Sequence, residues 1–209
     1  MNKNYWESLY LRQNADLKPS LFAKYIADNF FKEGKSLIEL GCGNGRDAIF
    51  FANEGIDVLA IDQCENEIEF LKNRFSNPKN VRFLCGDFTN LDNNESFDII
   101  YSRFTLHSIT EKEERKTLIW SFTNLNPNGI LCVEVRGHGN EIFGKGEPVI
   151  GEKNAYIYDE HYRRFLNFNN FCKNLSDIGF FIDYAEEAKG FAPYKGEDQT
   201  FIRVIARKK

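Results

Sequence analysis

The chain lacks the features that mark membrane, secreted and nucleic-acid-binding proteins. Among its 209 residues no apolar run approaches the roughly 20 residues of a membrane helix, and Met1–Glu7 has no apolar signal core. Its formal net charge of -4 disfavours a general nucleic-acid binder, because such proteins are usually basic. We therefore expect a cytoplasmic protein, a monomer or homodimer, without nucleic-acid or membrane partners.

The sequence also lacks the cysteine spacing of a disulfide framework or a zinc site. Its five cysteines form no C-x-x-C pair, and no His–carboxylate cluster has the spacing of metal ligands. We expect five reduced thiols and no metal. With 42% hydrophobic and 28% charged residues, the composition suits one globular domain over residues 1–209.

A glycine-punctuated stretch from Ser36 to Asp47 is the most informative part of the chain. Ser36–Leu40 is a short apolar run that fits a buried parallel strand, and glycines follow at positions 41, 43 and 45. A helical pattern comes next. Glycine admits positive φ and lets a ligand approach the backbone closely. Strand, glycine turn and helix N-terminus together predict a nucleotide-sized ligand site at the carboxyl edge of a sheet.

The glycine spacing separates two ligand classes. A dinucleotide fingerprint reads G-x-G-x-x-G, whereas this chain has Gly-x-Gly-x-Gly with Glu39 two residues ahead of Gly41. Asp62 ends the next strand pattern, and a carboxylate there suits the two hydroxyls of a ribose. Asp62 fits a methyltransferase or a dehydrogenase equally well.

Acid-x-Gly-x-Gly-x-Gly resembles the first motif of class I S-adenosylmethionine-dependent methyltransferases. Patterns that resemble the later motifs of this family follow in the same sequence, as far as residue 135. Gly86-Asp87-Phe88 closes a third strand pattern, Phe97–Ser102 resembles the fourth-strand motif, and Leu125–Leu131 resembles the turn into the fifth strand. The resemblance implies S-adenosyl-L-methionine as cofactor and S-adenosyl-L-homocysteine as product. In it, Asp87 accepts from the adenine amino group and Phe88 packs on the adenine ring.

The expected cofactor contacts come from the loops after the first four strands and from the N-terminus. They are Glu39, Gly41, Gly43, Gly45, Asp62, Gln63, Asp87, Phe88, Ser102, Arg103, Trp6 and Tyr10. Residues 1–18 are expected to form a flap over the cofactor, with Trp6 and Tyr10 one helical turn apart. The alternative is a segment whose aromatic side chains dock on the core.

Alternating strand and helix patterns predict an α/β, Rossmann-like fold with helices on both faces of a parallel sheet. The family resemblance implies seven mostly parallel strands with an antiparallel last strand. Helices are expected at about 19–31, at 47–54, from 65 to before Pro78, from a capping box at Thr110, and at 168–178. Ile119 and Phe122 should face inward, and strands should follow at about 180–185 and 200–207.

Residues 136–167 form an insertion that is longer than a bare crossover connection needs. The segment is rich in glycine and carries basic and histidine side chains suited to a phosphate or carboxylate. We interpret it as a substrate lid; the alternative is a solvated loop whose charges pair with one another. The substrate contacts expected from it are Arg136, His138, His161, Arg163 and Arg164, with one of the two adjacent arginines facing solvent.

His107, five residues past Ser102, is the candidate general base. Methyl transfer from a sulfonium depends mainly on positioning, and a base is needed only where the acceptor holds its proton at neutral pH. The alternative for His107 is a packing or loop-fixing role.

The sequence therefore predicts a methyltransferase acting on a small anionic acceptor, at an oxygen. The Arg-Gly-His turn and the His-Tyr-Arg-Arg segment resemble methyltransferases of surface-polysaccharide (capsule) biosynthesis, which implies a sugar-linked or phosphate-like acceptor. The rivals are a methyltransferase for another small metabolite, a dehydrogenase, an RNA or protein methyltransferase, and a non-catalytic S-adenosylmethionine binder. The glycine spacing disfavours the dehydrogenase, and the absence of the Asn/Asp-Pro-Pro-aromatic motif at Ser102–Thr105 disfavours an RNA or protein amino-methylating enzyme.

Overall fold

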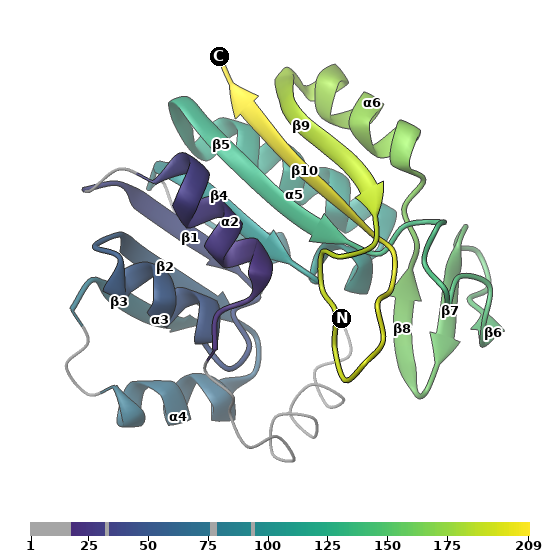
Figure 1. Ribbon diagram of the computed structural model, residues 1–209, viewed down its shortest axis with the longest axis horizontal. Coiled ribbons are helices and arrows are strands. Elements are labelled where there is room, and N and C mark those ends of the chain that lie inside the picture. The colour runs from purple at the N-terminus through teal and green to yellow at the C-terminus, as the bar shows by residue number, and fades with distance from the viewer. Residues whose placement is uncertain (1–17, 32–33, 76–78, 93–94) are drawn as a thin grey trace.

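The computed structural model describes residues 18–31, 34–75, 79–92 and 95–209, and the expected flap residues Trp6 and Tyr10 lie outside these ranges (Figure 1). Its large sheet contains β1 (Ser36–Leu40), β2 (Asp57–Asp62), β3 (Val81–Cys85), β4 (Phe97–Arg103), β5 (Leu125–Val135), β9 (Phe180–Ala188) and β10 (Phe201–Lys208). The helices are α2 (Leu21–Phe30), α3 (Arg46–Asn53), α4 (Glu65–Arg74), α5 (Glu111–Asn124) and α6 (Phe168–Ile178), with short 3-10 turns η1 (Phe88–Asn90) and η2 (Leu106–Ser108).

The large sheet has the order β3-β2-β1-β4-β5-β10-β9. Strands β1 to β5 pair in parallel, and β10 is antiparallel to both of its neighbours. The expected seven strands with an antiparallel last strand are confirmed. The parallel strands bring the loops after β1, β2, β3, β4 and β5 to one edge of the sheet (Figure 1), which is where ligands of open α/β sheets bind.

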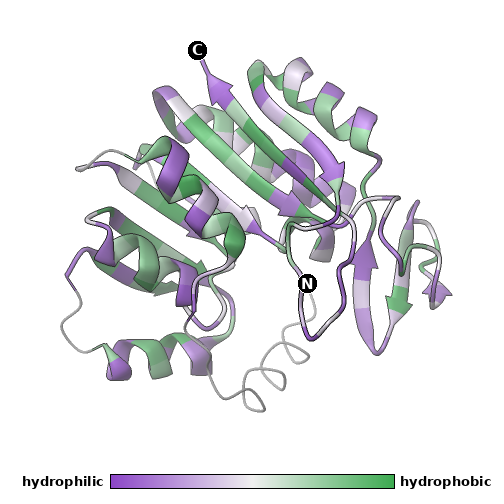
Figure 2. Cartoon of the chain, viewed as in Figure 1, coloured by the Kyte–Doolittle hydropathy of each residue, from purple (hydrophilic) through white to green (hydrophobic). Residues whose placement is uncertain are grey.

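Two apolar layers hold helices on opposite faces of this sheet. On one face α2, α3 and α4 contribute Phe22, Phe51 and Leu71 to a buried cluster with strand residues such as Ile99. On the other face α5 and α6 cover the strands, with Phe171 among the buried side chains. Figure 2 shows the apolar residues concentrated along the central strands. The polar candidate residues therefore gather at the strand ends.

Two helix details differ from expectation. Pro19 precedes α2 and is not in its first turn, because Ser20 is the N-cap and its hydroxyl accepts from the Ala23 N–H at 3.0 Å. Ile119, expected to face inward, is 45% exposed. The buried face of α5 instead includes Leu118 with polar side chains one helical turn before and after it, an arrangement that apolar periodicity alone does not predict.

Residues 136–167 contain a second, three-stranded antiparallel sheet that was not expected. It comprises β6 (Glu147–Pro148), β7 (Ala155–Tyr158) and β8 (His161–Arg164), and it stands beside the carboxyl end of β5 (Figure 1). Its hairpin turn places Asp159 and Glu160 at φ 49° and 58°. Because such turns usually carry Asn-Gly, Asp-Gly or Gly-Gly, the pair Asp159-Glu160 does not predict a hairpin.

Candidate functional site

The glycine loop after β1 folds its N–H groups back onto the protein. Gly41, Gly43 and Gly45 all have positive φ (78°, 52° and 72°), as expected. The N–H groups of Gly41 and Cys42 both donate to the Ile61 carbonyl, at 2.8 and 2.9 Å, and Gly43 donates to Asp62 at 2.9 Å. A phosphate-binding loop points such donors at its ligand. This loop therefore lacks the donor arrangement of a pyrophosphate site.

Carboxylates surround the loop and make it suitable for a cation. Glu39 is 4% exposed, and its Oε2 has no hydrogen-bond partner in the described chain. Burial first, and then the charge of Asp47, raise the Glu39 pKa well above its ordinary value near 4.5; Asp62 acts in the same direction, whereas Arg46 and Arg103 act in the opposite direction. An unsatisfied buried carboxylate beside two other acids calls for a positively charged group such as an ammonium.

Asp62 is the last residue of β2, and Gln63 follows it directly. The two Asp62 oxygens accept from the N–H groups of Gly43 and Cys64, each at 2.9 Å. Each oxygen keeps a second lone pair, so the carboxylate can still accept from ribose hydroxyls. The Gln63 side-chain amide nitrogen is buried without a partner among the described residues. Both side chains therefore retain hydrogen-bonding capacity next to the loop.

Asp87 and Phe88 behave differently from each other. Asp87 is exposed and caps η1 by accepting from the Thr89 N–H and hydroxyl, at 2.9 and 2.8 Å. Phe88 is 3% exposed and belongs to the core, and a Cβ on Gly41 would lie 3.7 Å from its ring. Phe88 thus packs beneath the glycine turn, and its expected contact with an adenine ring stays a prediction.

Ser102 and Arg103, at the end of β4, are both held by protein partners. The hydroxyl of Ser102 lies 2.5 Å from that of Thr105. The Arg103 Nε donates to Glu134 at 3.0 Å, and the guanidinium lies 4.0 Å from the centre of the Phe104 ring. The Arg103 side chain is therefore used in an ion pair, which does not support its expected cofactor contact.

Two buried polar networks were not found from the sequence. Glu134 is completely buried between Arg103 and Arg203, and Arg203 donates to it at 3.1 and 2.6 Å. Asp47 accepts from the N–H and hydroxyl of Ser20, both at 2.7 Å, and from Tyr101 at 2.9 Å. In the sequence, the signal that could have predicted these two networks was an isolated charged residue within an apolar stretch. These networks fix α2 and the strand ends around the loop.

Arg136 follows β5 and is partly buried without an acidic hydrogen-bond or ion-pair partner among the described residues. Its Nη1 donates to the side-chain oxygens of Asn140 and Gln199, at 2.9 and 2.6 Å, and its guanidinium lies 5.1 Å from the Phe201 ring centre. Burial first, and then the positive charge of Arg163, lower the Arg136 pKa to about 10. A cation held only by neutral groups is a candidate anion-binding site.

His107 lies in η2, next to Arg136. It is 4% exposed, and its Nδ1 accepts from the Arg136 backbone N–H at 3.4 Å. Burial, followed by the charge of Arg136, lowers the His107 pKa well below its usual value. The imidazole is therefore neutral at physiological pH, with its proton on Nε2. A weak base in that tautomer is a hydrogen-bond donor, which does not support the expected role as general base.

Of the remaining expected substrate residues, His138 and His161 lie on different elements. The His138 ring stacks on Phe143, with ring centres 4.5 Å apart, and its Nε2 is buried without a partner in the described chain. His161 is 3% exposed on β8, and burial followed by the charges of Arg163 and Arg136 lowers its pKa to about 3. His161 therefore stays neutral close to the two arginines.

The adjacent arginines of β8 correct two expectations. Arg164 is 7% exposed; it forms an ion pair with Glu114 and donates to the backbone oxygens of Leu106 and Ile109. It therefore holds the turn that carries His107 instead of facing a substrate. Neither arginine is exposed to solvent, because Arg163 is also partly buried and donates to the Tyr158 carbonyl at 2.6 Å. The alternating pattern of β8 did not reveal this.

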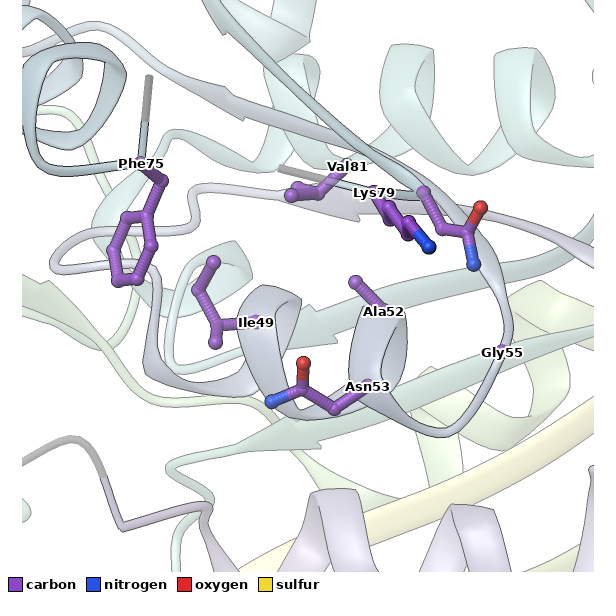
Figure 3. Close-up of a pocket in the computed structure, with 8 residues that line it drawn as sticks. Ile49, Ala52, Asn53, Gly55, Phe75, Lys79 and Val81 are labelled. Carbon is purple, nitrogen blue, oxygen red and sulfur yellow. The ribbon is translucent and has the colours of Figure 1, made fainter. Parts of the chain in front are cut away.

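Other features of the described residues do not compete with this site. No group of three or more His, Cys, Asp or Glu side chains there could hold a metal ion, and no helix there is long and apolar enough to cross a membrane. A hollow of about 390 Å³ lies at the far end of α3 from the glycine loop and is lined by residues such as Ile49, Asn53 and Lys79 (Figure 3). It contains no carboxylate, histidine or cysteine, so we assign it no chemistry.

Sequence comparison finds a family match over the part of the chain that contains the glycine loop. Residues 37–129 match the family described as "Methyltransferase domain". Phosphoethanolamine N-methyltransferase 3 of Arabidopsis thaliana is 31% identical over 138 residues, which cover 58% of this chain and 28% of the plant protein. The chain spans less than half the length of two further sequence relatives as well.

Solved structures match over most of the chain. A SAM-dependent methyltransferase from Methanosarcina mazei has a TM-score of 0.74 and 20% identity, covering 88% of this chain and 96% of that one. The 1,6-didemethyltoxoflavin-N1-methyltransferase of Burkholderia thailandensis, solved with its substrate and S-adenosylhomocysteine, has a TM-score of 0.73 and 20% identity, covering 99% and 87%. At these identities the likeness establishes the fold.

Proposed function

Because residues 37–129 belong to the methyltransferase domain family and the chain has the class I methyltransferase fold, we propose that it transfers a methyl group from S-adenosylmethionine to a small anionic acceptor. The observation that carries this proposal is the buried Glu39 carboxylate, whose Oε2 has no hydrogen-bond partner among the described residues and whose pKa the charges of Asp47 and Asp62 raise. It lies under a glycine loop whose donors point inward. This arrangement favours a cationic ligand and disfavours a pyrophosphate.

The chain's own residues suit each part of this cofactor. Glu39 would hold the ammonium of the methionine end, and Asp62 would accept from the ribose hydroxyls. The buried amide of Gln63 and the exposed carboxylate of Asp87 would serve the adenine. When bound, the cofactor supplies an electrophilic methyl group on a sulfonium. The protein then has to orient the acceptor and exclude water.

The acceptor would lie between the ends of β4 and β5 and the 136–167 segment. Arg136 supports an anionic acceptor, since its partly buried charge is matched by no acidic hydrogen-bond or ion-pair partner among the described residues. The Arabidopsis relative is named for phosphoethanolamine, which carries a phosphate. The phosphate-like, sugar-linked groups of surface-polysaccharide synthesis are negatively charged in the same way. The lid role of residues 136–167 remains part of this proposal.

The state of His107 favours an acceptor that needs no general base. Its lowered pKa and its bond from Arg136 make it a neutral donor at physiological pH. An oxygen that is already ionised can attack the methyl group without proton removal. We therefore propose methylation at an ionised oxygen. An amine or alcohol acceptor would need another group to take its proton.

A panel of paired acceptors tests this function by measuring S-adenosylhomocysteine formation. Each pair consists of a phosphate or carboxylate compound and its uncharged analogue, and phosphoethanolamine and sugar phosphates are included. We expect the charged member to have the higher kcat/KM by at least about tenfold, since losing a bond to a charged group costs roughly 1.5–3 kcal/mol. Equal rates would contradict the anionic acceptor. Tight cofactor binding without turnover on any member would favour the non-catalytic binder.

A further inference from the structure

The guanidinium of Arg136 has one edge occupied and one edge open. Among the described residues only Nη1 has hydrogen-bond partners, which are the side-chain oxygens of Asn140 and Gln199. Nε and Nη2 have no hydrogen-bond acceptor within the described ranges. These two nitrogens lie on the same side of the guanidinium, and their parallel N–H groups match the two oxygens of a carboxylate or phosphate.

The open edge is held in a fixed position. Asn140 is 3% exposed and is itself anchored, because its amide nitrogen donates to the Thr200 carbonyl at 2.7 Å. The Phe201 ring supports one face of the guanidinium at 5.1 Å. Glu141, a nearby acid, accepts from the Thr200 N–H at 2.8 Å and lies 3.2 Å from Lys189. Glu141 is therefore bonded to Thr200 and Lys189, and although its charge acts on Arg136, the two side chains form no hydrogen bond or ion pair.

His107, which is hydrogen-bonded to the Arg136 backbone, offers a third donor. Its Nδ1 accepts from the backbone N–H of Arg136, which leaves the proton on Nε2. Nε2 has no partner in the described part of the chain. Arg164 fixes the turn around His107 through the carbonyls of Leu106 and Ile109. The side chains of Arg136 and His107 thus each keep N–H groups without an acceptor among the described residues, and the charge of Arg136 acts on His107.

We propose that Arg136 and His107 form a two-point binding site for one oxyanion group of the acceptor, a phosphate or a carboxylate. Arg136 would bind two oxygens through Nε and Nη2, and His107 would donate from Nε2. This inference deepens the proposed function and rests on it for the identity of the ligand as acceptor. It also assigns His107 a binding role in place of the proton transfer expected from the sequence.

Inorganic phosphate is the probe that tests this site without turnover. Its binding to the full chain is measured by calorimetry in the absence of cofactor, for wild type, Arg136→Lys and His107→Phe. Arg136→Lys keeps the positive charge but loses the two parallel N–H groups of the guanidinium, so we expect the Kd for phosphate to rise about tenfold or more. His107→Phe should raise Kd by a smaller factor. Acetate and sulfate in the same titration distinguish carboxylate from tetrahedral oxyanion preference.

Arg82→Lys is the matched control, because Arg82 is an exposed arginine on β3 that forms an ion pair with Glu95. It should leave phosphate binding unchanged. Retained S-adenosylhomocysteine binding shows that the Arg136 and His107 variants are folded. Equal phosphate affinity in wild type and Arg136→Lys would overturn the proposal, as would absence of phosphate binding to wild type. Phosphate binding that depends on Arg136 in a protein without methyl transfer would uphold the site and reject the proposed function.

Discussion

Replacing Glu134 by glutamine tests how the carboxyl end of the sheet is held together. Glu134 is completely buried on β5, and its two oxygens bind Arg103 of β4 and Arg203 of β10. The side chains of these arginines are only 15% and 7% exposed. Glutamine preserves the shape but removes the charge. Two nearly buried guanidinium groups would then face each other without their shared carboxylate.

Breaking a buried pair by removing one partner costs about 3–5 kcal/mol, since an uncompensated charge stays in the interior. Two cations depend on Glu134, so we expect the upper part of that range. Domains of this size have unfolding free energies of about 5–15 kcal/mol. The variant should therefore lose a large fraction of its stability, and the loss should appear as a lower urea midpoint.

A double-mutant cycle identifies the cause. Arg203→Met removes one cation, and its non-polar chain can still pack on the rings of Phe22 and Phe191 that Arg203 now covers. The double variant Glu134→Gln/Arg203→Met should lose less than the sum of the single losses, by more than about 1 kcal/mol. A loss below about 1 kcal/mol for Glu134→Gln, or strict additivity, would refute this reasoning.

Two further predictions concern backbone strain and pH. Gly41→Ala should lower the unfolding free energy by more than Gly190→Ala. Both glycines have φ near +80°, but of the two added Cβ atoms only the one at Gly41 would collide with a neighbour, Thr105. By urea unfolding we expect losses of about 1 kcal/mol for Gly190→Ala and about 2–4 kcal/mol for Gly41→Ala, and equal losses would exclude the clash. His107 has a folded pKa below its unfolded value near 6.5, so the unfolded chain binds more protons and stability should fall as pH drops below about 6.5. His107→Phe should make that fall shallower in unfolding curves, and an unchanged slope would contradict the lowered pKa.

The fold could be predicted because its signals are local. The positive φ of the three loop glycines follows from residue type, and the Thr110 capping box is present with both of its hydrogen bonds. The parallel sheet follows from the alternating elements, and its seven strands with an antiparallel last strand follow from the family resemblance. Each of these depends on neighbours in sequence. None requires knowledge of which distant side chains meet.

The site was predicted less completely because its contacts join distant segments. Arg164 was expected at the substrate, but its partner Glu114 lies fifty residues earlier on α5. Arg103 was expected to contact the cofactor, but its side chain forms an ion pair with Glu134. Side-chain partners across a sheet leave no periodic signal. The hairpin turn at Asp159 was missed because glutamate, and not glycine, follows the aspartate.

The most direct test of the account is calorimetric titration with S-adenosylhomocysteine and, separately, with NAD, on wild type and Glu39→Gln. Glu39 is a cleaner position than Asp62, whose carboxylate also holds the backbone N–H groups of Gly43 and Cys64. We predict tight S-adenosylhomocysteine binding that Glu39→Gln weakens about tenfold to hundredfold. The difference should widen as pH rises, because the raised pKa of Glu39 keeps it partly protonated at lower pH. NAD binding, or the same S-adenosylhomocysteine affinity in both proteins, would contradict the account.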